Sequence, residues 1–396
     1  MMPRTLGWLT LFLVGTDLFV MSPLLPEITH GFSVSTSAGG WAVSVFALAY
    51  LVGGPTLAAL ADRAGRRGVL IAALAVFAVA NLATALAPSF PVLLGARAMA
   101  GLAASGITPS VYAMVSATAP PAARATWLAI VTSGLLIALT IGAPTGSLLA
   151  SAVGWQGVFV VLAVAAVLIL ASTTVWTRRA ATPPTAGVDP FGIATTAGGS
   201  DHHRPEPAPA VVTKVRAVSV TALWALAVYG PYTYLGIILR EHLGFPTSVA
   251  AGALVCFGAG AVIGNLAGGR LADRFGGRLT SVITLVLLAG AETLVGLFLH
   301  AGPALLLASL AAMALVAYPF FSAQQARLIA RYPAAGASLI AWNNTAMYAG
   351  ILVGSALGGT ALAYSGPTLL VFAAAGVALL AALVATSTIT PPAPSS

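Results

Sequence analysis

Long stretches without a charged residue are the feature of this sequence that most constrains its fold. Charge-free intervals run, for example, from Glu27 to Asp62 and from Arg67 to Arg97, and only 7% of the 396 residues are charged whereas 59% are hydrophobic. A water-soluble domain usually carries about a quarter charged residues, whereas a helix of about 20 apolar residues crosses the hydrocarbon core of a bilayer. The sequence therefore predicts an all-α polytopic membrane protein.

The few charges also divide the chain into twelve predicted transmembrane helices, because an ionised group is costly inside the bilayer. Two uncharged stretches are too long for one span, and we divide them near Gly154 and Gly366. The predicted spans are residues 6–28, 37–60, 68–88, 91–117, 122–152, 156–177, 217–239, 247–270, 279–300, 303–324, 335–362 and 366–388.

Residues 178–216 differ from the rest of the chain because they are rich in Pro, Thr and Gly and carry several charges. This composition predicts a mobile cytoplasmic linker. It separates an N-terminal six-helix bundle, residues 1–177, from a C-terminal one, residues 217–396. His202 and His203 are adjacent in the linker without further ligands, so we interpret them as solvated surface and predict no metal site and no cofactor.

The basic residues predict how the chain is oriented in the membrane. If the N-terminus is cytoplasmic, nearly all of them face the cytoplasm and Arg240 alone lies in an outer loop, as the positive-inside rule expects. The net charge of +8 then needs no nucleic-acid partner. Arginine is preferred over lysine, with Lys214 the only lysine, and alanine is abundant, which indicates a GC-rich bacterium. We expect a bacterial inner (cell) membrane protein with both termini in the cytoplasm.

A short motif recurs at the same place in both halves. Leu60-Ala61-Asp62-Arg63, with Gly65 and Arg67, reappears at a constant spacing as residues 271–274, with Gly276 and Arg278. Both copies join the second and third predicted helices of a half. This match predicts duplication of a six-helix unit, with the halves related by an axis along the membrane normal, an architecture found in transporters.

Both copies resemble the loop signature of the major facilitator superfamily, Gly-x-x-x-Asp-Arg-x-Gly-Arg-Arg, although Ala58 stands where the family usually has Gly. Residues 97–101 resemble its Arg-x-x-x-Gly motif. Residues 142–146, Gly-Ala-Pro-Thr-Gly, resemble the antiporter signature except for the inserted Ala143, and with residues 154–159 they resemble the drug and sugar efflux branch. The resemblance covers the whole chain and implies two pseudo-symmetric six-helix bundles of the drug:proton antiporter family.

Few ionisable groups lie inside the predicted spans, and Asp17 and Arg97 are the candidates for proton coupling. In the family, the helices that hold them line the central cavity, so Arg97 is expected to pair with Asp17 in one state. At the repeat spacing, their counterparts are Val228 and Ala308, so this pair is not duplicated. A static buried ion pair is the alternative interpretation.

Glu292 is a third ionisable group within a predicted span, and its counterpart in the first half is Asn81. The family places the helices that carry them at the periphery. We therefore favour a polar packing site over proton coupling for Glu292.

Two further groups are expected to act in the conformational cycle. The charged residues of the two loop motifs predict a cytoplasmic latch that holds the halves together in the outward-open state. The alternative is that the basic residues only set the topology. The latch residues are Asp62, Arg63, Arg67, Asp273, Arg274 and Arg278. Two glycines and a proline, Gly142, Pro144 and Gly146, predict a bend in the fifth predicted helix. The family associates this segment with preventing proton leak. Generic helix packing is the alternative.

Aromatic and amide side chains supply the candidates for a substrate cavity. The best cluster surrounds Gly230-Pro231 in helix 7, where the chain is expected to break. The candidates are Phe19, Tyr112, Tyr229, Tyr232, Tyr234, Asn343 and Asn344. Aromatic residues also form membrane cores and interfacial belts, and the asparagines, with Gln324 and Gln325, could instead bond between helices.

These features predict a secondary transporter rather than an enzyme. We expect proton antiport that exports a small amphipathic drug-like or natural-product compound by alternating access; proton-coupled sugar or nucleoside efflux is the alternative, and a transport-like sensor or membrane-embedded enzyme is less favoured. No Gly-x-x-x-x-Gly-Lys loop is present, so a gradient is expected to supply the energy. The expected partners are a small-molecule substrate, protons and the lipid bilayer, with no nucleic acid, and the protein is expected to be monomeric.

Overall fold

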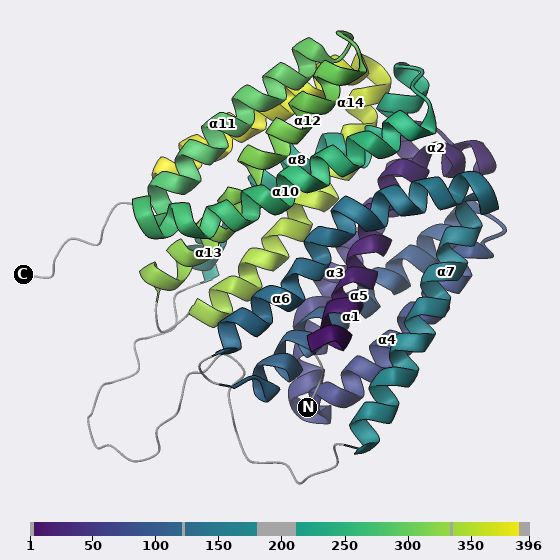
Figure 1. Ribbon diagram of the computed structural model, residues 1–396, viewed down its shortest axis with the longest axis vertical. Helices are drawn as coiled ribbons and strands as arrows, with labels where there is room; N and C mark the ends of the chain where they lie inside the picture. Colours follow the sequence, from purple (N-terminus) through teal and green to yellow (C-terminus); the bar gives the residue numbers. More distant parts are fainter. Residues whose placement is uncertain (1–3, 121–122, 180–210, 333–335, 388–396) are drawn as a thin grey trace, which may run out of the picture.

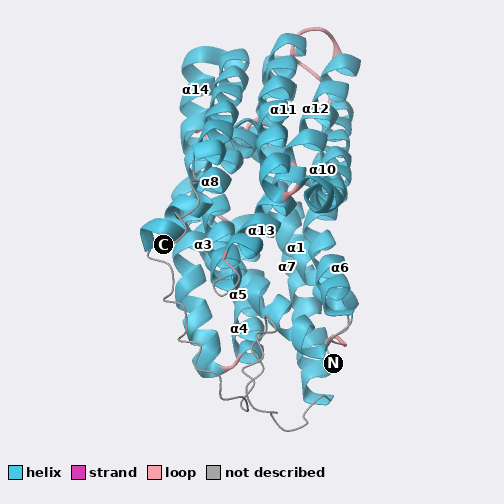
Figure 2. Ribbon diagram, turned by 90° about the vertical axis from the view of Figure 1, so that its left-hand side faces the viewer, coloured by secondary structure: helices cyan, strands magenta, loops and turns pink. Residues whose placement is uncertain are grey.

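A computed structural model describes residues 4–120, 123–179, 211–332 and 336–387 of the chain. These residues form two bundles of helices that lie side by side, as Figures 1 and 2 show. Helices of the first half occupy one side of the molecule and those of the second half the other. The described parts therefore follow the two-bundle organisation expected from the repeat.

The first half begins with a bent span and continues through long helices. Its elements are α1 (Arg4–Phe19), α2 (Met21–Phe32), α3 (Thr36–Ala64), α4 (Arg66–Ala85), α5 (Phe90–Thr118), α6 (Arg124–Ile137), the π-helical segment η2 (Ala138–Gly142) and α7 (Ala143–Arg179). In α7 the chain reverses at Gly154, whose φ of 74° lies in the left-handed region that favours glycine.

The second half repeats this arrangement. Its elements are α8 (Val211–Thr233), α9 (Leu235–Ile237), the π-helical segment η3 (Ile238–His242), α10 (Thr247–Phe275), α11 (Gly277–Phe298), α12 (Pro303–Ala317), α13 (Pro319–Arg331) and α14 (Gly336–Ser387). In α14 the chain reverses at Gly366, with a φ of 75°, at the place that corresponds to Gly154.

Twelve crossings of a membrane follow from these elements. Nine helices of the described residues are long and apolar enough to span a bilayer, and the bent pair α1 and α2 makes ten. Two of these contain the reversals at Gly154 and Gly366 and so cross twice. The predicted fold of twelve transmembrane helices in two bundles is confirmed.

The helices on both sides of the linker extend into the residues predicted to form it. Helix α7 continues to Arg179 and α8 begins at Val211, so helical turns extend into residues that the sequence assigned to the linker 178–216. A helix can continue beyond the hydrocarbon core because its charged side chains are then solvated, and composition alone does not reveal this extension. Residues 180–210, with His202 and His203, lie outside the described residues.

The repeat needs one correction. The counterparts Gly65 and Gly276 set the spacing of the repeat. The counterparts Gly154 and Gly366 are one residue further apart than this spacing, and so are Pro91 and Pro303, which lie at the starts of α5 and α12. The second half therefore has one extra residue before α12. The counterpart of Arg97 is then Ser309 and not Ala308, whereas Val228 remains the counterpart of Asp17.

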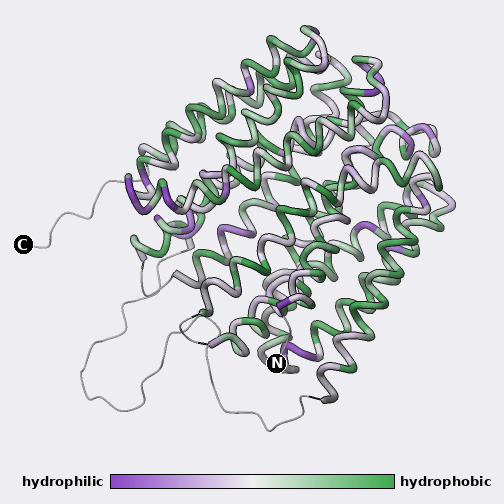
Figure 3. Tube along the Cα trace, viewed as in Figure 1, coloured by the Kyte–Doolittle hydropathy of each residue, from purple (hydrophilic) through white to green (hydrophobic). Residues whose placement is uncertain are grey.

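Hydrophobic residues predominate along the helices, and hydrophilic residues gather mainly near the helix ends (Figure 3). We call the end that carries Arg4, Gly65 and Gly276 the linker end, and the opposite end, with Gly154 and Gly366, the far end. On α11, for example, Leu294 and Leu297 are exposed. Apolar flanks of this kind suit a surface that faces lipid.

Candidate functional site

A buried ion pair lies in the centre of the first half. Arg97 on α5 donates from Nη1 to Asp17 Oδ1 on α1 at 2.8 Å, and its Nη2 lies 3.4 Å from the backbone oxygen of Asp17. Both side chains are completely buried. Asp17 Oδ2 has no hydrogen-bond partner among the described residues. This oxygen can accept a proton without first giving up a hydrogen bond.

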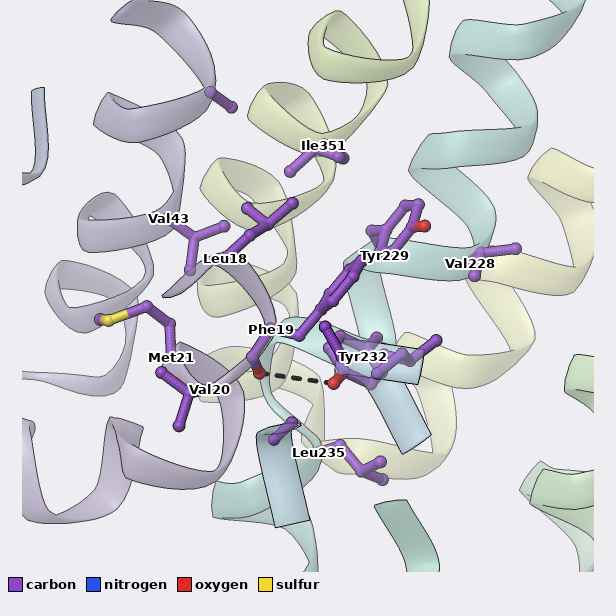
Figure 4. Packing of buried hydrophobic residues seen from close by; sticks show 14 of the residues in the cluster. Leu18, Phe19, Val20, Met21, Val43, Val228, Tyr229, Tyr232, Leu235 and Ile351 are labelled. Carbon is purple, nitrogen blue, oxygen red and sulfur yellow. Dashed lines mark hydrogen bonds between the residues drawn. The ribbon is translucent and has the colours of Figure 1, made fainter. Parts of the chain in front are cut away.

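A pocket between the two halves begins two residues further along the chain. Phe19 stacks on Tyr229 with ring centroids 6.2 Å apart and meets Tyr232 edge-on at 6.0 Å. The Tyr232 hydroxyl donates to the Phe19 carbonyl at 3.4 Å, the dashed line in Figure 4. The pocket is lined by Leu18, Phe19, Ser22, Val43, Tyr229, Tyr232, Thr233 and Ile351.

The bends in the helices place these aromatic residues. The first span bends by 45° after Phe19, and the seventh breaks at Tyr234 after Pro231, which lacks the amide proton that a continuous helix needs. Because the breaks in the two spans lie together, side chains at the end of α1 and in the last turn of α8 meet across the halves.

The aromatic wall continues into the second half. The hydroxyls of Tyr229 and Tyr318 lie 3.1 Å apart, and Trp224 donates from Nε1 to the carbonyl of Ala317 at 2.9 Å. Phe257 meets Tyr232 with ring centroids 5.0 Å apart. This wall offers apolar faces and a few hydroxyls, and no side chain in it carries a formal charge at neutral pH.

Other predicted cavity residues lie elsewhere. Tyr234 packs near the far end, where its hydroxyl donates to the Ser355 carbonyl and its ring lies against the glycines of α3 and α14. Asn343 accepts from Thr221 at 2.5 Å, which is a bond between helices α14 and α8. Tyr112 accepts from Thr132 at 3.2 Å within the first half, and Asn344 is half-buried.

The pocket also includes residues that sequence reasoning missed, among them Leu18, Val43 and Ile351. In the sequence, an aliphatic residue that lines a pocket cannot be distinguished from one that faces lipid or packs in a core. Only the meeting of three helices distinguishes these positions. By contrast, the proline break beside Tyr229 and Tyr232 is a local signal, and it located both residues.

Contacts between the halves close the far end. Arg240 of η3 pairs with Glu27 of α2, and His30 Nε2 lies 3.1 Å from Glu241 Oε1. Nearer the centre, the hydroxyls of Ser44 and Ser355 lie 2.7 Å apart in a buried contact between α3 and α14. These contacts hold the halves together beyond the central pocket.

The predicted latch lies at the linker end. Arg67, Asp273, Arg274 and Arg278 are exposed, and the guanidinium carbon of Arg274 lies 5.3 Å from the centroid of the Phe275 ring. The side chains of Asp62 and Arg63 lie outside the described residues. Its role as a latch stays a prediction.

The glycines and proline of the fifth transmembrane span lie at the junction of the π-helical segment η2 and α7. The π-helical segment η2 ends at Gly142, and a Cβ at Gly142 or Gly146 would collide with Thr16 or Val20 of the first span. These glycines therefore allow α1 to approach closely, next to the turn that carries Asp17. A role of this segment in preventing proton leak stays a prediction.

Glu292 on α11 is fully buried, and neither of its carboxyl oxygens has a hydrogen-bond partner among the described residues. Its counterpart Asn81 is also buried and donates to the Phe77 carbonyl at 3.0 Å. Glu292 is not among the residues that line the central pocket.

Comparisons with known proteins agree with this arrangement. A solved bacterial homologue of the human lysosomal transporter Spinster, in an inward-facing and occupied conformation, has a TM-score of 0.72 at 20% identity, over 97% of this chain and 96% of that one. An uncharacterized MFS-type transporter, YceJ of Bacillus subtilis, is 29% identical over 65% of this chain, and a chloramphenicol resistance protein of Streptomyces lividans is 31% identical over 63%.

The alignments span 63% and 62% of those two relatives, less than two thirds of their lengths. The family model described as Major Facilitator Superfamily matches residues 7–259 and 219–396, which together cover nearly the whole chain. The expectation of a transporter rather than an enzyme is thereby confirmed. The chain is a multi-pass membrane transporter and belongs to the Major Facilitator Superfamily.

Proposed function

We propose that this protein exports a small amphipathic drug-like or natural-product compound from the bacterial cytoplasm in exchange for protons. The observation that carries the proposal is the buried Asp17–Arg97 pair, which lies two residues from Phe19 in a pocket shared by both halves. Protonation at Asp17 removes the charge that Arg97 faces, so it changes the contacts between α1 and α5. Such a change beside the pocket links proton uptake to substrate release.

The lining of the pocket supports an amphipathic substrate. Aromatic faces and aliphatic side chains dominate it, and Ser22, Thr233 and the tyrosines supply hydroxyls. A sugar would need more hydrogen-bonding groups, because each buried hydroxyl without a partner is costly. The similarity to a chloramphenicol resistance protein also favours drug export.

The contacts between the halves support alternating access. With the N- and C-termini in the cytoplasm, the linker end faces the cytoplasm and the closed far end faces outward. Export then requires the ion pairs Glu27–Arg240 and His30–Glu241 to separate while the latch at the linker end forms. The segment from Gly142 to Gly146 keeps α1 closely packed during this change. One protein molecule contains both halves and is proposed to act as a monomer.

The proton gradient supplies enough energy for this task. One proton crossing a potential of about 100 mV and one pH unit releases about 2.3 plus 1.4 kcal/mol. That free energy sustains a gradient of a neutral substrate of about several hundred-fold.

Purified protein in lipid vesicles tests the proposal. We expect chloramphenicol, or another neutral aromatic compound of a screening panel, to drive proton movement, and Asp17→Asn to abolish this coupling because an amide cannot exchange the proton. Glu292→Gln makes the same chemical change outside the pocket and should leave coupling intact. Proton-driven export that persists in Asp17→Asn, or uphill export after collapse of the proton gradient, would contradict the proposal.

A further inference from the structure

Arg97 is held by more than its carboxylate. Its guanidinium carbon lies 4.8 Å from the ring centroid of Phe46 on α3 and 5.7 Å from that of Phe159 on α7. Both phenylalanines are completely buried. The face of an aromatic ring attracts a cation, most strongly where water is excluded. Four helices of the first half thus converge on one buried guanidinium.

The attraction to the rings matters most when Asp17 is neutral. When Asp17 is ionised, the pair has no net charge. The attraction of the rings for the guanidinium is then largely offset by their repulsion of the carboxylate. Proton uptake forms one O–H bond on the Asp17 carboxylate, leaves Arg97 with its own proton and raises the charge of the pair by one. The guanidinium is then a buried cation without a counter-ion, which is costly.

We propose that Phe46 and Phe159 are positioning residues that hold the Arg97 guanidinium in place while Asp17 carries a proton. The inference rests on the proposed proton exchange at Asp17. Without the two rings, the protonated state would leave Arg97 free to move away or to draw water into the centre of the half. With them, the pair re-forms as soon as Asp17 loses its proton.

The second half provides an internal comparison. Where Asp17 and Arg97 have uncharged counterparts, the counterpart of Phe159 is Val371, counted from Gly154 and Gly366. The counterpart of Phe46 is Phe257, which packs against Tyr232 and Tyr318. An aromatic residue at the position of Phe46 therefore suits either half, whereas a ring at the position of Phe159 accompanies the charge.

Other titratable groups near the pair bond elsewhere. From the elements packed around α1 and α5, the described titratable side chains within the bundle are Tyr50 on α3 and Tyr112 on α5. Tyr50 stacks on Tyr348 with ring centroids 3.6 Å apart. Tyr112 accepts a hydrogen bond from Thr132. Asp17 is the described carboxylate that forms an ion pair with Arg97.

Fluorinated phenylalanines test the inference because they weaken the attraction of the ring face while nearly preserving its size. We would place mono-, di- and trifluorophenylalanine at Phe159, and separately at Phe46, and measure thermal unfolding of the full-length protein in lipid nanodiscs over a range of pH. The trifluoro variant should lower the unfolding midpoint by about 1 to 4 °C more at acidic than at alkaline pH, in steps that follow fluorine content.

Two comparisons separate positioning from packing. In the Asp17→Asn background Arg97 has no counter-ion at any pH. Fluorination should then lower the unfolding midpoint at every pH by as much as it does at acidic pH in the protein with Asp17. At Phe257, whose ring faces no cation among the described residues, fluorination should lower the unfolding midpoint by an amount that does not depend on pH. An equal loss at every pH and in both backgrounds would overturn the inference. This outcome is distinct from a failure of proton antiport, which the vesicle experiment with Asp17→Asn reports separately.

Discussion

The two halves of the molecule share one architecture and differ in what they bury at its centre. The first half buries the Asp17–Arg97 ion pair, whereas the second has Val228 and Ser309 at those positions. The second half contributes the larger part of the aromatic wall, with Trp224, Tyr229, Tyr232, Phe257 and Tyr318. The duplicated helices and turns thus form the framework that both halves share, and we propose that the charge pair, present in one half, handles protons.

This difference identifies which side chains depend on one another. An ion pair without water is stable only while both partners are present, because the charge left behind lacks compensation. An aromatic wall loses its contacts one at a time. The first half should therefore respond to single changes at its centre more strongly than the second.

Removal of Arg97 is the strongest way to challenge this comparison. Arg97→Gln leaves Asp17 buried without its cation, and we expect the free energy of unfolding to fall by about 3 to 5 kcal/mol. Denaturation of the protein in detergent or nanodiscs measures the loss. The double variant Asp17→Asn with Arg97→Gln should recover part of it, because no charge then remains. Equal losses in the single and double variants would show that the pair is not the stabilising unit.

Glu292 gives the second prediction, because it is a buried carboxyl group in the other half without a described partner. Glu292→Leu removes an unsatisfied polar group from an apolar site and should raise the free energy of unfolding by about 1 to 3 kcal/mol. Asn81→Leu is the matched control; it removes an oxygen without a described partner but also the hydrogen bond from the Asn81 amide nitrogen to the Phe77 carbonyl, so it should stabilise the protein less than Glu292→Leu does. Proton-coupled transport should survive in Glu292→Leu.

Loss of coupling in Glu292→Leu would break the comparison between the halves. The second half would then also handle protons, and Asp17 would be one of two sites. Destabilisation without loss of coupling would instead show that Glu292 has a bonding partner that matters for packing, as the sequence interpretation favoured.

The sequence predicted the fold well because each signal was local. Charge-free runs located the spans, and the loop motif located the repeat and its turns at Gly65 and Gly276, both of which have a positive φ. The bends were harder to place. Pro231 marked the break after α8, but the bend after Phe19 was not predicted, although Pro23, four residues later, cannot donate a backbone hydrogen bond to the Phe19 carbonyl. Helix ends beyond the bilayer, as at Arg179, were missed because hydropathy does not report them.

The candidate site could be predicted only in part, for a physical reason. Rare side chains such as Asp17 and Arg97 stand out in an apolar sequence, because each needs compensation at bilayer depth. Tyrosines do not stand out in this way: Tyr232 borders the pocket, whereas Tyr234, two residues later, packs against glycines at the far end. Which side a residue faces beyond a helix break depends on the bend, and the sequence does not specify its angle.

The far-end ion pairs give the smallest expected effect and sharpen the comparison where the halves meet. Arg240 and Glu27 are about a third exposed or less, so Arg240→Gln should weaken closure by about 1 kcal/mol or less. A closed state weakened by this amount loses its population advantage about fivefold, which spin labels on the α2–α3 and η3–α10 loops would detect as a longer distance. Arg67→Gln, exposed at the linker end, is the control and should not lengthen it. An unchanged distance in Arg240→Gln would mean that the buried contact between Ser44 and Ser355, rather than the ion pairs, holds the far end closed.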